Sequence, residues 1–227
     1  MKRLALLLAL PLLILSQSDL RAQNLPDFAG RWYVSGDIGP SFMQDVDVND
    51  FLAPVSGVEM EFDVGMQLSA GGGFFFTDWL ALEGQTGFAT SYLDEIKGMG
   101  FVDVGHSSLT QVPFLMNVVF QYPNRSGLVP YGGVGGGVSI SVFDADEITD
   151  YATYYVDGAD SDAVGAFQAF GGLRYELNPQ LELGLVYRYL QTGDSEWDVN
   201  GGLTPVGDIA IDGVEVHSVN FTFRMRF

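Results

Sequence analysis

Histidine followed by serine is the first pattern in this sequence that would suit catalysis. His106 precedes Ser107 and Ser108, and His217 precedes Ser218. A general base must lie within hydrogen-bond distance of the hydroxyl group that it activates. His217 and Ser218 fall on opposite faces of a segment in which apolar and polar residues alternate, and His106 lies in a connection near the end of another such segment. We therefore expect no catalytic residue and predict that the protein is not an enzyme.

Charged residues are the second group that could have a function. Many of them occupy the polar face of segments in which apolar and polar residues alternate. If that face lines an interior, each charge must be paired and hydrogen-bonded, since an isolated buried charge is very costly. The same charges would also suit a gate or a narrow ion path, and this alternative stays open. We predict an interior ion-pair network of Asp37, Glu83, Arg174, Glu176, Glu182, Arg188, Arg224 and Arg226, with Arg31 also pointing inward.

Eight alternating segments must position these residues. Side chains of a strand point alternately to its two faces, so strict alternation of apolar and polar residues marks a strand with two different faces. Each segment exceeds the roughly 9–11 residues that a tilted strand needs to cross the hydrocarbon of a membrane. The alternation predicts strands at 31–43, 61–76, 80–93, 108–122, 128–143, 163–177, 181–194 and 213–227.

The connections between these segments alternate in length. Three are tight turns rich in turn-forming residues, at 77–79, 123–127 and 178–180. The other four are long, at 44–60, 94–107, 144–162 and 195–212. Short turns on one side and long loops on the other are typical of a β-barrel that spans a membrane. We predict an all-β fold, an eight-stranded antiparallel transmembrane β-barrel with short periplasmic turns and four long extracellular loops.

A soluble eight-stranded barrel with an apolar interior is the competing fold. The polar faces consist mostly of Gly, Ser, Ala and Gln, which would solvate an outer surface poorly. The apolar faces carry aromatic residues near both strand ends, where the girdles of a membrane barrel lie. Both features favour the membrane barrel.

The N-terminus indicates export. Lys2 and Arg3 precede an apolar run over 4–15, which is too short to span a bilayer comfortably as a helix and is typical of a secretory signal. We predict a cleaved signal peptide at 1–22, with a cut after Ser18 as the alternative, and a barrel domain at 23–227. The chain has no cysteine, and its net charge of −19 argues against nucleic acid as a partner.

Several segments carry a resemblance to a known family. They are Arg31-Trp-Tyr-Val-Ser-Gly-Asp-Ile-Gly, Val129-Pro-Tyr-Gly-Gly-Val-Gly-Gly-Gly-Val, the stretch 171–190, and the alternation that ends the chain. The chain resembles outer-membrane β-barrel proteins of the opacity-protein and OmpA membrane-domain type, small barrels of the porin-like superfamily. The resemblance implies the outer membrane of a bacterial cell, a plugged lumen, and an assembly signal read by the barrel-assembly machinery, at Phe221, Phe223, Met225 and Phe227.

The four long connections are acidic, and Lys97 is their only basic residue. The runs at 144–147 and 157–162 offer oxygen ligands for Ca²⁺, but their spacing does not match an EF-hand loop, and a charge run is usually a solvated surface. We therefore predict no metal site and no cofactor. We expect outer-membrane lipid and lipopolysaccharide as partners, the latter through weak bridging by divalent cations.

Together these patterns predict a non-enzymatic outer-membrane protein with an envelope-structural or surface-interaction role, four mobile acidic loops and a mostly plugged polar lumen. A closed barrel has no free edge strand, so we expect a monomer. The alternative is a small selective channel for ions or small solutes. A third reading, a lipid A-modifying enzyme, is disfavoured because the segment around His106 lacks the upstream basic residue and the Asn after the serine that barrels of that kind carry.

Overall fold

The computed structural model describes residues 28–51, 54–98, 102–150, 155–201 and 207–227. The elements in these ranges are all β-strands. Within the same ranges, no helix is long and apolar enough to cross a membrane. The predicted signal peptide at 1–22 lies outside the described residues.

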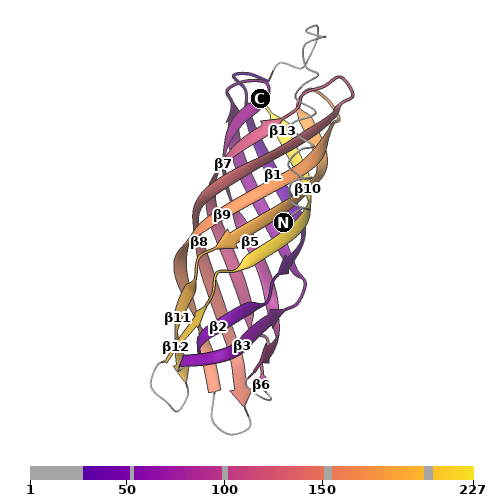
Figure 1. Ribbon diagram of the computed structural model, residues 1–227. Helices are drawn as coiled ribbons and strands as arrows, with labels where there is room; N and C mark the ends of the chain where they lie inside the picture. Colours follow the sequence, from indigo (N-terminus) through magenta and orange to yellow (C-terminus); the bar gives the residue numbers. More distant parts are fainter. Residues whose placement is uncertain (1–27, 52–53, 99–101, 151–154, 202–206) are drawn as a thin grey trace, which may run out of the picture.

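Eight long strands form a closed antiparallel ring (Figure 1). Each strand pairs with its neighbours in the ring, and β1 pairs with β13, which places Val34 opposite Met225 and closes the barrel. The ring confirms the predicted eight-stranded barrel. Its strands are β1 (Trp32–Met43), β4 (Gly65–Phe75), β5 (Leu80–Lys97), β7 (Ser108–Gln121), β8 (Leu128–Asp150), β9 (Tyr155–Glu176), β10 (Leu181–Thr192) and β13 (Glu215–Arg226).

The predicted strands agree with this ring at the end where the three tight turns and the C-terminus lie, which we call the turn end. They differ at the opposite, distal end. There β5, β8 and β9 continue well into the predicted loops. β4 begins at Gly65 instead of residue 61, because Glu61 and Phe62 belong to a separate strand that pairs with the end of β5.

The four predicted long loops consist mainly of strand in their described parts, which corrects the expectation of mobile loops. They contain β2 (Val46–Phe51), β3 (Pro54–Phe62), β6 (Val102–Asp103), β11 (Ser195–Gly201) and β12 (Gly207–Ile211). These strands pair between different connections: β12 with β2, β11 with β9, and β3 with β5. Their pairing supplies the backbone hydrogen bonds that the short segments would lack alone.

These five strands and the distal ends of β5, β8 and β9 continue the barrel wall away from the turn end, and we call them the distal extension (Figure 1). Apolar side chains fill its interior. The buried core there includes Met43, Val46, Val48, Phe51, Val58, Met60, Ile96, Phe143, Ile148, Trp197, Ile209 and Ile211. The extension is therefore built like a soluble barrel, with its apolar residues inside.

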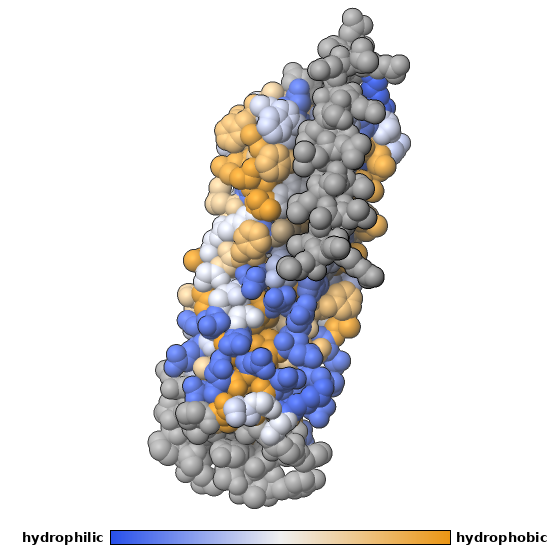
Figure 2. Space-filling model, in the orientation of Figure 1, coloured by the Kyte–Doolittle hydropathy of each residue, from blue (hydrophilic) through white to orange (hydrophobic). Residues whose placement is uncertain are grey.

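The ring has the opposite polarity. Its interior holds the buried charged and amide side chains together with a smaller, mostly aromatic cluster that includes Phe28, Tyr33 and Phe75, and large apolar side chains are exposed on its outside. Aromatic residues lie toward both edges of this outer surface, as expected for a lipid-facing band. Figure 2 shows apolar residues gathered toward the turn end and hydrophilic residues toward the extension. Exposed residues of the band include Trp32, Trp79 and Phe120 near the turn end, Phe42, Tyr92 and Tyr187 near the extension, and Leu68, Met116, Val138 and Leu185 between them.

Candidate functional site: the barrel interior

An ion pair between Arg188 and Asp37 lies in the middle of the interior. Arg188 Nη2 is 2.5 Å from Asp37 Oδ2, and both side chains are buried. Asp37 also accepts a hydrogen bond from Ser69 Oγ at 2.9 Å. Arg188 Nη1 donates to Gln85 Oε1 at 3.2 Å and to Gln168 Oε1 at 3.4 Å. The pair thus has the additional hydrogen bonds that a buried ion pair needs.

Buried amides extend this network across the barrel. Gln168 Nε2 donates to both Gln85 Oε1 and Asn117 Oδ1 at 2.6 Å. Asn117 Nδ2 donates to Gln85 Oε1 at 2.9 Å and to Glu83 Oε1 at 3.4 Å. Glu83 also accepts from Ser35 Oγ at 2.9 Å. Because these residues come from β1, β5, β7 and β9, the network joins strands on different sides of the ring.

A second group of charges lies toward the turn end. Arg226 Nη2 is 3.0 Å from Glu176 Oε1 and 3.4 Å from Glu182 Oε1. Arg224 Nη1 is 3.6 Å from Glu182 Oε2 and donates a hydrogen bond to Gln121 Oε1 at 2.7 Å. Arg224 and Glu182 are fully buried. These contacts join β13 to β9, β10 and the end of β7.

Aromatic rings cover the guanidinium group of Arg224, which belongs to this second group, and that of Arg174. The Arg174 guanidinium carbon lies 3.3 Å from the centre of the Tyr131 ring, and that of Arg224 lies 4.4 Å from the centre of the Tyr33 ring. Cation–π contacts of this kind are stronger when the charge is shielded from water. Arg174 forms no ion pair with the described residues, so its contact with the Tyr131 ring takes the place of a carboxylate partner.

Phe28 closes the turn end and was missed by sequence reasoning. Its ring is fully buried, 5.6 Å from the Phe75 ring and 4.3 Å from the Arg226 guanidinium carbon, measured from ring centres. The backbone N–H groups of Phe28 and Ala29 donate to Asp78 Oδ1 at 2.7 and 3.1 Å. Phe28 precedes the first alternating segment, so the alternation of apolar and polar residues could not predict that it lies inside the barrel.

The structure places the eight predicted interior charges inside the ring. Ion pairs join Asp37 with Arg188, and Glu176 and Glu182 with the arginines of β13. Glu83 is held by hydrogen bonds and Arg174 by Tyr131. Arg31, which we also expected inside, is exposed, because it precedes β1 at the rim of the turn end. The proposed assembly-signal residues are exposed on the outer face: Phe221, Phe223, Met225 and Phe227.

Trp197 marks the centre of the apolar core in the distal extension. It is fully buried, packs against Phe143 with ring centres 5.4 Å apart, and donates from Nε1 to the Ser141 carbonyl oxygen at 2.9 Å. Sequence reasoning assigned this segment to an acidic loop. Trp197 lies between the acidic residues Glu196 and Asp198, and this alternation could have predicted a strand with Trp197 on its buried face.

In both histidine and serine pairs, the histidine is more exposed than the serine that follows it. Ser107 is buried and donates its hydroxyl to the Val104 carbonyl oxygen at 2.8 Å, whereas His106 is exposed. His217 lies on the outer face, where Nδ1 is 2.6 Å from the Tyr187 hydroxyl oxygen, and Ser218 is buried on the inner face. Among the described residues, no group of three or more His, Asp or Glu side chains is arranged to hold a metal ion.

Similar sequences and similar structures cover most of the chain. Uncharacterised proteins of Brucella abortus and Brucella suis are 26% identical in an alignment that covers 78% of this chain and 70% of the relative. The outer membrane protein OprG of Pseudomonas aeruginosa has a similar structure, with a TM-score of 0.60 and 18% identity over 87% of this chain and 96% of OprG.

The outer membrane protease OmpT of Escherichia coli is similar with a TM-score of 0.56, 6% identity and coverage of 91% of this chain and 100% of OmpT. Identities this low show the fold alone. A family model for the outer membrane protein β-barrel domain matches residues 5–227. With a closed eight-stranded ring, an apolar outer band and a match over almost its whole length, the chain belongs to the outer membrane β-barrel protein family.

Proposed function

We propose that the protein is a closed, non-enzymatic, monomeric barrel of the bacterial outer membrane, with an envelope-structural or surface-interaction role. The apolar core of the distal extension carries this proposal, because it fills the barrel beyond its polar interior. Long connections of membrane barrels lie outside the cell. We therefore assign the extension to the cell surface and the turn end to the periplasm.

Side chains occupy the interior at three levels, which supports a barrel that does not conduct. Phe28 lies at the turn end, the pair of Arg188 and Asp37 in the middle, and Trp197 in the extension. A cavity beside Gln85 and Gln168 has a volume of about 10 Å³, which is room for about one water molecule. An ion path would need continuous hydrated space through all three levels.

The outer surface of the extension is acidic. Asp47, Glu59 and Glu95 are exposed on neighbouring strands, and Lys97 donates a hydrogen bond to Glu61. This bond raises the pKa of Lys97, because it favours the charged ammonium group. Exposed carboxylates on a paired sheet suit weak bridging by divalent cations to anionic lipopolysaccharide, which we propose as a partner of this surface.

Retention of the folded protein by lipopolysaccharide vesicles tests this partner. Binding should require Mg²⁺ and should fall when Asp47, Glu59 and Glu95 are together changed to their amides. The matched control exchanges each of these residues for the other acid, as Asp47→Glu, Glu59→Asp and Glu95→Asp, which keeps the charge and should keep the binding. Wild-type protein in buffer with EDTA should show the cation-independent background. Equal retention with and without Mg²⁺ would contradict the bridging.

A narrow channel is the second candidate, and one observation favours it. Several buried polar atoms of the ring interior lack a hydrogen-bond partner, among them Ser41 Oγ, Tyr131 Oη and Asn220 Oδ1. Water molecules would satisfy these atoms, and a connected file of water would admit ions. The apolar core around Trp197 argues against such a file, because a dry core would interrupt it.

Proteoliposomes distinguish the two candidates. Vesicles loaded with a chloride-sensitive dye should show the same slow chloride entry with the folded protein as without protein, and vesicles that contain a general porin should equilibrate fast. Folding is checked by the change in gel migration on heating. Fast entry that scales with the amount of folded protein would reject the closed barrel and support the channel.

A further inference from the structure

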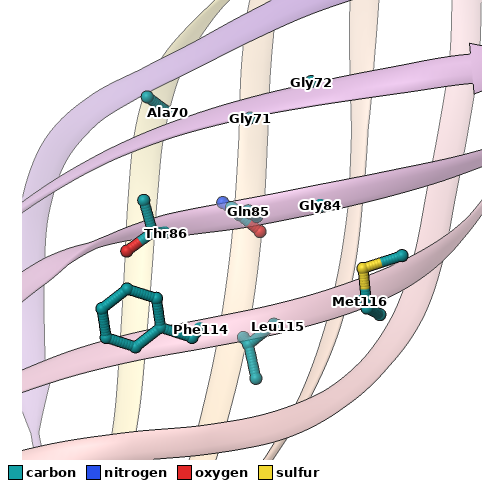
Figure 3. A pocket seen from close by; sticks show the side chains of 9 residues that line it. All are labelled: Ala70, Gly71, Gly72, Gly84, Gln85, Thr86, Phe114, Leu115 and Met116. Carbon is teal, nitrogen blue, oxygen red and sulfur yellow. The ribbon is translucent and has the colours of Figure 1, made fainter.

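An apolar groove lies on the membrane-facing side of β4, β5 and β7. Its volume is about 520 Å³. Figure 3 shows bare backbone at Gly72 and Gly84, with the side chains of Phe114 and Met116 on the neighbouring strand. The outward-facing residues that line it are Ala70, Gly72, Gly84, Thr86, Phe114 and Met116.

Small residues at paired positions create the groove. Gly72 lies opposite Gly84, and Ala70 lies opposite Thr86. On the next strand, Met116 lies opposite Gly84 and Phe114 opposite Thr86, so two large side chains form one wall. Met116 and Phe114 are about half exposed. A floor of four small residues beside a wall of two long ones makes a concave strip on an otherwise bulky surface.

The groove lies within the lipid-facing band. Along β4 and β5 it is flanked by Leu68 and Leu82, which are both exposed on the outer face. The aromatic residues that mark the edges of the band lie beyond it, at Phe76 directly after β4 and at Tyr92 on β5. At this depth the available ligands are apolar, because the surrounding hydrocarbon excludes water and charged groups.

A second copy of the chain fits this groove poorly. A stable protein interface takes about 20–30 residues from each partner, whereas nine residues line the groove. A two-fold dimer would also place one concave strip against another, which leaves both unfilled. An unbranched hydrocarbon chain can follow a strip of small residues and contact both side chains of the wall.

We propose that this groove binds one acyl chain of a membrane lipid, held between the floor at Gly72 and Gly84 and the wall at Phe114 and Met116. The bound chain exchanges more slowly than the lipid that surrounds the rest of the barrel. The site depends on the membrane placement of the ring and is independent of the surface role proposed above.

Glycine substitutions can fill the groove while leaving the barrel wall intact. A Cβ at Gly72 would meet its nearest atom at 3.9 Å, and one at Gly84 would meet Met116 Sδ at 3.6 Å, which are ordinary contacts. Gly72→Leu and Gly84→Leu therefore place a side chain in the groove. Gly171→Leu is the matched control, because Gly171 is exposed on the outside of β9 with its nearest atom also at 3.9 Å.

Methyl NMR of the folded protein in detergent micelles tests the proposal. The methionine methyl groups are labelled with ¹³C, and the sample is titrated with palmitoyl-oleoyl-phosphatidylethanolamine. The Met116 signal should shift and saturate, whereas Met225, exposed on β13, should follow the bulk lipid content. Gly72→Leu and Gly84→Leu should remove the saturable shift, and Gly171→Leu should keep it.

Two outcomes would overturn the proposal. One is a Met116 methyl shift that follows the lipid content as the Met225 shift does in the wild-type protein. A saturable Met116 shift that persists in both Gly72→Leu and Gly84→Leu would count equally against the proposal. The other is a doubling of the protein mass in light scattering that disappears in Gly72→Leu, which would make a second copy the occupant. A saturable shift with an unchanged protein mass supports the acyl chain.

Discussion

Arg188 and Asp37 form an ion pair across the last strand of the barrel. Arg188 Nη2 lies 2.5 Å from Asp37 Oδ2, and the two residues belong to β10 and β1, which flank β13 in the ring. The strands come from opposite ends of the sequence, so the pair forms only when the ring closes. It therefore links the polar interior to the closure of the barrel.

Loss of one partner of this pair should destabilise the barrel strongly. Arg188→Met should lower the free energy of unfolding by about 3–5 kcal/mol, because Asp37 is left as an unpaired buried charge. The double variant Asp37→Asn/Arg188→Met should recover much of that loss. Urea unfolding of the detergent-folded protein measures both. A double variant no more stable than Arg188→Met would contradict the pairing, and Lys97→Met, which removes an exposed pair, is the control.

Phe28 should stabilise the turn end. Phe28→Ala removes a fully buried ring that packs against Phe75 and Arg226, so the free energy of unfolding should fall by about 3–5 kcal/mol. Phe42→Ala is the control, because Phe42 faces the lipid band and leaves no internal cavity. Equal unfolding midpoints in urea for Phe28→Ala and the wild-type protein would show that residues before β1 do not hold the barrel closed.

Trp197 should hold the distal extension together without supporting the ring. Trp197→Ala empties the centre of the apolar core, so proteinase K should cut the extension while the ring keeps its heat-dependent gel migration. Trp197→Phe keeps most of the volume and loses the hydrogen bond to Ser141, at a cost of about 1 kcal/mol. It should resist the protease nearly as well as the wild type. Identical digestion of all three proteins would contradict a packed extension.

Phe227 should matter for assembly in cells and much less for refolding in detergent. Its side chain is exposed, and its backbone N–H donates to the Trp32 carbonyl oxygen at 2.9 Å, a bond that Phe227→Ala retains. We expect a several-fold loss of folded protein in the outer membrane and unchanged refolding from urea. Phe120→Ala, an exposed residue of β7, is the control. Equal losses in cells and in detergent would indicate a structural role instead.

The ring could be predicted because each of its strands carries a long alternation between lipid-facing and interior residues. The segment that ends at Phe227 shows this most clearly, since every outward position from Val219 onward is apolar. Tight turns such as the one at Asn178 then fixed the order and the antiparallel pairing. A pattern of period two over ten or more residues is the strongest local signal that a strand can give.

The sequence pattern could not predict which of the interior charges pair with one another. Alternation shows that Arg188 and Asp37 point inward, but which charges meet depends on the stagger between strands around the closed ring. The distal extension was missed for a related reason. β11 and β12 are short, and β12 pairs with β2 from a connection more than 150 residues earlier in the chain. Trp197 and Ile209 alternate with outward-facing acidic residues, and we interpreted these acidic segments as solvated loops instead of strands.

Single-channel recording in a planar bilayer tests the closed interior most directly. The refolded barrel, produced as residues 23–227 and with folding confirmed by its heat-dependent gel migration, should give no discrete conductance steps across the range of voltages that general porins tolerate. Steady openings in the wild-type protein, altered in size or ion preference by Arg188→Met, would contradict the closed barrel and establish a channel through the polar interior.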